Sequence, residues 1–115
     1  MENTSVPTDS WQRQYRRLCS GLTRIGYISQ GSVLDRSTLR PPRSGYQWTR
    51  KVAQKTVTIS LTPEQFALLG QAVDNYRRLR QKLQKMEQLS RKIIFETAPH
   101  LARRKRLSPK VLGLN

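Results

Sequence analysis

The chain has 115 residues, of which 22 are Lys or Arg and only 7 are Asp or Glu, so its formal net charge is +15 and its isoelectric point is about 11.3. This length predicts one domain with flanking tails, and so many uncompensated cations favour an anionic partner, most often nucleic acid. The sequence has no long apolar run and no apolar signal-peptide core near its start. This pattern argues against a transmembrane helix and predicts a cytoplasmic protein associated with the nucleoid or a ribonucleoprotein.

The first predicted element is a helix over residues 9–26, after a disordered segment over residues 1–8. Asp9 or Ser10 is expected to cap its first backbone N–H groups, and Gly26 suits the left-handed conformation that ends a helix. Cys19 stands alone, which excludes an internal disulfide, and is interpreted as a small core residue. The apolar positions recur at steps of three and four and form one face: Trp11, Tyr15, Leu18, Leu22 and Ile25.

A small antiparallel sheet is predicted next. Residues 31–39 are a weak strand candidate, and the prolines within residues 40–45 interrupt regular structure. Residues 46–61 alternate in polarity on both sides of a short junction near Ala53 and Gln54, which predicts a hairpin. The junction lacks Asn-Gly or Asp-Gly, so the type of turn stays open.

A long helix follows, from Pro63 to about Thr97. Thr62 is the expected N-cap, Pro63 suits the first helical position, and Gln65 completes a capping box, while Pro99 stops the helix. Its apolar stripe is Phe66, Leu69, Val73, Tyr76, Leu79, Leu83, Met86, Leu89 and Ile93. The first half is expected to cover the hairpin.

The second half has no sheet left to cover. Its seam, which consists of Leu83, Met86, Leu89 and Ile93, is predicted to pack on the N-terminal helix, on a second copy or on another protein. The fold class is therefore α+β: one domain over residues 9–98 with an N-terminal helix, a two- to three-stranded antiparallel sheet and a long C-terminal helix. A basic tail over residues 99–115 completes the chain.

The residue pattern predicts no enzyme, no metal and no cofactor. His100 is the only histidine, and it lies beside Pro99 at a predicted helix end. The carboxylates are scattered without metal-ligand or paired-acid spacing, and the glycines form no phosphate-binding loop. A small-molecule substrate is therefore not expected.

The cations give a broader signal. The residues expected to contact phosphate are Arg40, Arg43, Arg50, Lys51 and Lys55 in the proline loop and hairpin, Arg77 and Arg78 in the long helix, and Arg103, Arg104, Lys105 and Arg106 in the tail. A hairpin tip and an adjacent loop would project these side chains from the sheet. Tyr46 and Trp48 are interpreted as core residues rather than as platforms for base stacking, which favours contact with the backbone of structured RNA or of a duplex.

Three segments carry a resemblance: Gly31-Ser32-Val33, the hairpin from Tyr46 to Thr58, and the helical segment from Asn75 to Leu79. Through them, residues 20–90 resemble a family of small bacterial proteins that contain a domain of unknown function and are often encoded near transposases or other mobile elements. Where members of that family have a short cysteine cluster, this chain reads STLRPPRS, so a metal site held there would be missing. The resemblance implies a fold and a mobile-element or genome-defence setting, but no reaction.

These observations lead to the hypothesis of a non-catalytic accessory subunit that binds nucleic acid in a mobile-element, RNA-guided or defence complex. One alternative is a protein–protein adaptor or homodimeric scaffold built on the long helix. Another is a small basic protein associated with ribosomes, and a third is a binder of anionic membrane surfaces.

Overall fold

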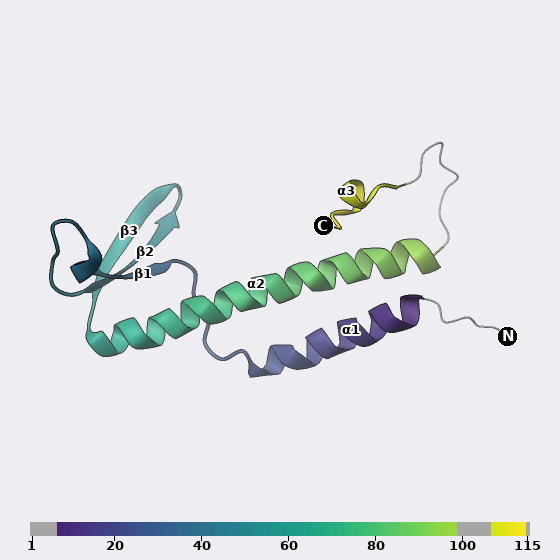
Figure 1. The fold of residues 1–115 in the computed structure, drawn as a ribbon, viewed down its shortest axis with the longest axis horizontal. Helices are drawn as coiled ribbons and strands as arrows, with labels where there is room; N and C mark the ends of the chain where they lie inside the picture. The colour runs from purple at the N-terminus through teal and green to yellow at the C-terminus, as the bar shows by residue number, and fades with distance from the viewer. Residues whose placement is uncertain (1–6, 99–106, 115) are drawn as a thin grey trace. The chain divides into compact units, whose positions relative to one another are not determined.

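The computed structural model describes residues 7–98 and 107–114 and has the predicted α+β class. In chain order it contains α1 (Pro7–Gly21), a 3-10 turn η1 (Leu22–Arg24), β1 (Ser32–Asp35), a second 3-10 turn η2 (Arg36–Thr38), β2 (Tyr46–Val52), β3 (Lys55–Leu61), α2 (Pro63–Thr97) and α3 (Pro109–Leu112). These elements form two compact units, one from residues 1–24 and 80–115 and the other from residues 25–79. We call them the helical unit and the sheet unit, and α2 contributes to both (Figure 1).

α1 begins earlier than predicted. Pro7 and Thr8 are helical, and Thr8 is buried, so neither residue belongs to a disordered segment. Asp9 and Ser10 therefore lie inside the helix, and the prediction that one of them is its N-cap is wrong. Asp9 still favours the helix, because a carboxylate in the first turn interacts with the positive end of the helix dipole.

The end of α1 also differs from the prediction. The helix stops at Gly21 and tightens into η1, so residues 22–26 do not continue it. Gly26 has the expected left-handed backbone, with φ of +79°. It follows η1, however, and does not cap an α-helix.

The predicted start and end of α2, at Pro63 and Thr97, are confirmed. The backbone N–H of Gln65 donates to Thr62 Oγ1 at 3.1 Å, and the backbone N–H of Thr62 donates to Gln65 Oε1 at 2.9 Å. This reciprocal pair is the capping box, which satisfies two donors that have no partner inside the helix. The helix then continues for 35 residues to Thr97, about 52 Å at 1.5 Å per residue. Pro99 and His100 lie outside the described residues.

In the helical unit, α1 runs antiparallel to the second half of α2 (Figure 1). The Nζ of Lys92 lies 5.6 Å from the ring centre of Trp11. At the other end of α1, a Cβ added to Gly21 would lie 2.8 Å from the Nζ of Lys82. Position 11 of α1 thus lies beside position 92 of α2, and position 21 lies beside position 82, as antiparallel helices require. Leu89 lies between these two points and is 1% exposed, so it forms the centre of this unit's core.

The sheet unit has strand order β1-β2-β3, with both neighbouring pairs antiparallel. Val33 is opposite Trp48, and Trp48 is opposite Ile59, so these three side chains share one face. The first half of α2 packs on this face. The ring of Tyr46 stacks on that of Phe66 with centroids 4.3 Å apart, and Val33 contacts the helix at Gly70.

The segment before β1 also attaches to α2. The N–H of Ser29 donates to the carbonyl of Ala72 at 3.1 Å, and Asn75 Nδ2 donates to the carbonyl of Tyr27 at 2.9 Å. Ala72 and Val73 are buried at this point. The prediction that the first half of α2 covers the hairpin is therefore confirmed only at the Tyr46 end, because every residue from position 50 to position 60 is exposed.

Part of the predicted basic tail is ordered into a single helical turn, α3. Ser108 caps it by accepting a bond from the N–H of Val111, and Gly113 ends it with φ of +72°. A Cβ on Gly113 would lie 2.7 Å from Nη1 of Arg91, so the end of α3 lies against α2 within the helical unit. Residues 107–114 are thus not an extended arm.

Candidate nucleic-acid interface

The tip of the β2–β3 hairpin is a two-residue turn. Val52 and Lys55 are the last paired residues, and Ala53 and Gln54 between them have φ of 50° and 68°. Positive φ at both central residues defines the type I′ turn, whose twist matches that of the flanking strands. Every residue from position 50 to position 60 is exposed, so this end of the hairpin is an accessible surface.

The three cations at the tip divide between the two faces of the hairpin. Arg50 is opposite Val57 and shares a face with Lys55, whereas Lys51 is opposite Thr56 on the other face. The first of these faces packs on α2 at the end of the sheet where β2 begins. We call the other face, on which Lys51 lies, the open face.

Hydroxyl groups line the open face on which Lys51 lies. Thr49 precedes Lys51 on β2, and Thr56, Thr58 and Ser60 alternate along β3. A threonine or serine hydroxyl can donate to a phosphate oxygen, and a lysine ammonium adds a point charge. No Asp or Glu occurs anywhere from residue 36 to residue 63, so no carboxylate within this stretch competes for these donors.

Arg36 fixes the open face at its other end. Its Nε donates to Gln47 Oε1 at 3.1 Å, and its Nη2 donates to Ser60 Oγ at 2.7 Å. One guanidinium therefore joins side chains of β2 and β3, and it adds positive charge beside a hydroxyl. Sequence reasoning did not single out Arg36, because its partners are 11 and 24 residues away along the chain and no local pattern marks them.

Trp48 is held in place from several sides. Its Nε1 donates to the carbonyl of Gln30 at 3.0 Å, and the guanidinium of Arg50 lies 5.5 Å from its ring centre. A Cβ on Gly31 would lie 2.5 Å from that same Nε1 and would also collide with the carbonyl oxygen of Thr49. The residue at position 31 must therefore be glycine, which also tolerates its φ of +104°. These contacts give Trp48 a structural role and agree with its interpretation as a core residue.

Arg40 and Arg43 do not lie next to the hairpin tip. They belong to the exposed loop between η2 and β2, which is at the Tyr46 end of β2, and the tip is at the Val52 end. The length of β2 separates the two groups by about 20 Å, since a strand rises 3.2–3.4 Å per residue. The expectation of one adjacent loop-and-tip cluster is wrong, because consecutive connections of an antiparallel meander alternate between the ends of the sheet (Figure 1).

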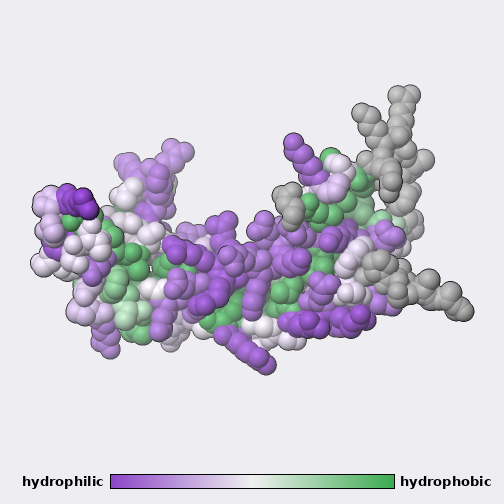
Figure 2. Space-filling model, viewed as in Figure 1, coloured by the Kyte–Doolittle hydropathy of each residue, from purple (hydrophilic) through white to green (hydrophobic). Residues whose placement is uncertain are grey.

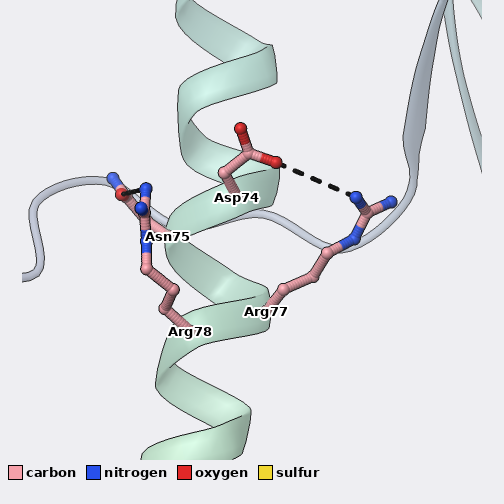
Figure 3. A network of polar contacts seen from close by, with 4 residues as sticks. All are labelled: Asp74, Asn75, Arg77 and Arg78. Atoms are coloured by element: carbon pink, nitrogen blue, oxygen red, sulfur yellow. Dashed lines mark hydrogen bonds and ion pairs between the residues drawn. The ribbon is translucent and has the colours of Figure 1, made fainter.

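Arg77 and Arg78 have partners on α2 itself (Figure 3). Arg77 pairs with Asp74 at 3.8 Å, and Arg78 Nη2 donates to Asn75 Oδ1 at 3.3 Å. Asn75 also holds the carbonyl of Tyr27, so Arg78 extends a network that attaches the segment before β1 to the helix. Both arginines remain exposed, but part of their hydrogen-bonding capacity is used within the sheet unit.

The predicted partner seam is largely covered by the chain's own helical unit. Leu89 is 1% exposed, Met86 and Ile93 are half-buried, and Leu83 is 42% exposed. Of the three predicted coverings, the N-terminal helix is therefore the one that the structure supports for Leu89. Arg103, Arg104, Lys105 and Arg106, the remaining candidate phosphate contacts, lie outside the described residues.

Asp35 has a structural role at the start of η2. Asp35 Oδ1 accepts the backbone N–H of Ser37 at 3.0 Å and caps η2. This backbone bond, followed by the Ser37 side chain, lowers the pKa of Asp35 below its usual 3.8.

Within residues 7–98 and 107–114, no three His, Cys, Asp or Glu side chains gather closely enough to hold a metal ion. In the same residues, no helix has both the length and the apolar character needed to cross a bilayer.

Hydrophilic side chains predominate on the face of the protein shown in Figure 2, above all over α2, and apolar side chains appear in separate patches. Comparisons with models of known protein families, with curated proteins and with solved structures found no match. Function is therefore inferred from the residues of the sheet unit.

Proposed function

We propose that this chain is a non-catalytic accessory subunit that binds the phosphate backbone of structured RNA or of a nucleic-acid duplex. One observation supports this function above the others: the segment from residue 36 to residue 63 contains six cations and no carboxylate. The cations are Arg36, Arg40, Arg43, Arg50, Lys51 and Lys55.

The open face supplies the chemistry that backbone recognition needs. Lys51 and the hydroxyls of Thr49, Thr56 and Thr58 can all donate hydrogen bonds to anionic oxygens, and Lys51 adds a full charge. Most contacts between proteins and nucleic acids go to phosphate and sugar, through these residue types. The aromatic side chains of β2 are engaged within the sheet unit, Trp48 with Gln30 and Tyr46 with Phe66, so the proposal includes no base stacking on this strand.

The expected hallmark is a steep dependence of affinity on salt. Each neutralised phosphate of a duplex contributes about −0.9 to the slope of log K against log salt concentration. A protein that contacts six to ten phosphates loses about 10³- to 10⁵-fold in affinity between 50 and 200 mM salt. A 20-base-pair duplex and a hairpin RNA, titrated by fluorescence anisotropy at four salt concentrations, measure this slope directly.

The decisive variant removes the charge of the hairpin tip. Replacement of Arg50, Lys51 and Lys55 by glutamine is expected to make the slope shallower by about 2 to 3 units and to weaken binding on the order of 10²-fold at 100 mM salt. These three residues are exposed and lie outside the core, so circular dichroism should show an unchanged fold.

The matched control removes the same charge from α1. Replacement of Arg13, Arg16 and Arg17 by glutamine also lowers the net charge by three, and these residues are equally exposed. The proposal predicts a much smaller change in slope than for the tip variant. Equal losses for the two variants would mean that net charge alone attracts nucleic acid, and the assignment to the hairpin would fail.

The mobile-element, RNA-guided or defence setting is part of the same proposal and rests on the sequence resemblance. It predicts that protein purified from its native cells carries nucleic acid that nuclease removes. Sequencing of that material would identify the setting, and cosedimentation with ribosomal subunits would point instead to the ribosome.

A further inference from the structure

β3 forms one edge of the sheet. The strand order places it beside β2 alone, and among the described residues no further strand pairs with its other side. Val52 and Lys55 close a two-residue turn and therefore form a hydrogen-bonded pair, and such pairs alternate along an antiparallel ladder. Lys55, Val57 and Ile59 thus direct their backbone groups to β2, whereas those of Thr56, Thr58 and Ser60 point to the open edge.

This edge lacks the features by which proteins usually prevent strand addition. Such edges are blocked by prolines, bulges, several charged side chains or a covering helix. β3 is seven residues long, pairs with β2 in unbroken register and contains a single charged residue, Lys55, at its start. Three outward-facing residues offer six backbone hydrogen-bonding groups to another strand.

Apolar side chains lie beside the edge on the face opposite the open face. Ile59 is 48% exposed, Val52 is 39% exposed and Val57 is 37% exposed. α2 contacts this face at Tyr46 and Val33, whereas Val52 and Val57 lie nearer the hairpin tip. Ile59 shares a cross-strand row with Val33 but lies on the outer strand and stays exposed. If another strand paired with this edge, every second side chain of that strand would lie on this face and would extend the apolar row.

The charge around the edge identifies the occupant. Arg50 and Lys55 flank the apolar row, Lys51 lies across from Thr56, and Arg36 bonds to Ser60 at the other end of β3. No carboxylate occurs from residue 36 to residue 63. A second copy of the chain would bring another +15 charge to this surface, which opposes self-association. An acidic segment of another protein would be attracted.

We propose that the open edge of β3 binds an extended segment of a partner protein in which apolar residues alternate with acidic residues. The segment pairs with Thr56, Thr58 and Ser60 through its backbone and adds its apolar side chains to Val57 and Ile59. Its carboxylates then lie on the open-face side, where Lys51 and Arg36 supply positive charge. This inference goes beyond the proposed function and does not depend on it.

A designed peptide tests the inference on the full-length chain. The probe is a nine-residue peptide with blocked ends in which valine alternates with glutamate. Titration into ¹⁵N-labelled protein is expected to shift the amide signals of Thr56, Thr58 and Ser60 and to slow their hydrogen exchange. A peptide of the same composition with its valines and glutamates in separate blocks, and one with lysine in place of glutamate, should each bind at least tenfold more weakly.

A proline substitution separates backbone pairing from other contacts. Thr58→Pro removes an N–H that points to the open edge and spares the bonds to β2, since proline is tolerated on edge strands. It should weaken peptide binding at least tenfold, whereas Thr58→Ala keeps the N–H and should bind within about twofold of wild type. A peptide N-methylated at the residues that face β3 tests the same bonds on the unaltered protein, in case Thr58→Pro does not fold.

Three results would overturn the inference. One is equal binding of the alternating and block peptides, and another is undiminished binding of the N-methylated peptide. The third is a concentration-dependent dimer in sedimentation with the β3 amides protected in the absence of peptide, which would make a second copy the occupant. Loss of binding by Ile59→Thr, which keeps the β-branched shape, would support the apolar part of the contact.

Discussion

The helix α2 and the hairpin β2–β3 differ in how far the chain itself pairs their charged side chains and buries their apolar ones. On α2, Arg77 pairs with Asp74 and Arg91 pairs with Glu87, whereas the hairpin contains three cations and no acid. α2 buries Leu89 almost completely, but β3 leaves nearly half of the Ile59 surface exposed.

This difference indicates where external partners fit. A helix side chain finds neighbours three and four positions away, and α1 supplies the remaining cover for Leu89 within the helical unit. The hairpin has one helix-covered end and one exposed end, where Val52, Val57 and Ile59 stay exposed. Residues 36–63 supply no carboxylate for its cations. The sheet unit therefore carries the surfaces that we propose for nucleic acid and for a partner strand.

The largest effect on stability is expected from the core of the helical unit. Leu89→Ala removes a side chain that is 1% exposed and should lower the free energy of unfolding by about 2 to 5 kcal/mol, through lost burial and the cavity left behind. The helical and sheet units hold one tryptophan each, Trp11 and Trp48. Trp48→Phe leaves Trp11 as the fluorescent reporter of the helical unit during denaturation by urea.

Leu83→Ala is the matched control, since it makes the same change on the same helix at a residue that is 42% exposed. It should cost less than about 1 kcal/mol. Ile59→Thr on the hairpin should be similarly mild when Trp48 is the reporter and Trp11 is replaced by phenylalanine. Comparable costs for Leu89→Ala and Leu83→Ala would contradict the burial of the seam by the helical unit.

Local sequence signals predicted the elements well. The residues of the capping box contact each other over three positions, so Thr62 and Gln65 determine the start of α2 without help from the rest of the chain. Strand alternation likewise fixed which side chains share a face of β2 and β3. The start of α1 was mistaken because Asp9 and Ser10 are strong capping residues, although Pro7 also suits the start of a helix.

Features that depend on distant residues could not be predicted. Arg36 joins Gln47 and Ser60 only after three strands have assembled. The choice of α1 as the cover for Leu89, from three possible partners, also depends on tertiary packing. The separation of Arg40 and Arg43 from the hairpin tip did follow from antiparallel pairing, but the sequence-based expectation placed the proline loop adjacent to the tip.

A smaller effect is expected from the turn at the hairpin tip. Ala53 and Gln54 adopt positive φ, which costs most residues about 1–2 kcal/mol each, whereas Asn-Gly adopts it readily. The double change Ala53→Asn and Gln54→Gly should raise the stability of the sheet unit by about 1 kcal/mol, part of the gain being offset by the greater entropy of glycine in the unfolded chain. Denaturation followed by Trp48 fluorescence measures it.

Gln54→Val provides a control of opposite sign. A β-branched residue is poorly tolerated at positive φ, so this variant should be less stable than the wild type. A stabilising Gln54→Val would show that the turn is not of type I′, and the assignment of backbone groups to the open edge of β3 would then need revision.

The smallest effect concerns the pKa of Asp35, which caps η2 in the sheet unit. The N–H of Ser37 is the main cause of its lowered pKa, because that bond favours the ionised carboxylate in the folded protein. The resulting stabilisation is fully present above the unfolded pKa, near 3.8, and is lost as pH falls through the lower folded pKa. A titration of the Asp35 carboxyl carbon by NMR should place its midpoint below 3.8. Ser37→Ala keeps the N–H and should retain most of the lowering, whereas Ser37→Pro removes the N–H and should return the pKa towards its ordinary value. A full return in Ser37→Ala would instead make the hydroxyl the principal cause, and the neighbouring Arg36 would need testing next if neither variant moved the midpoint.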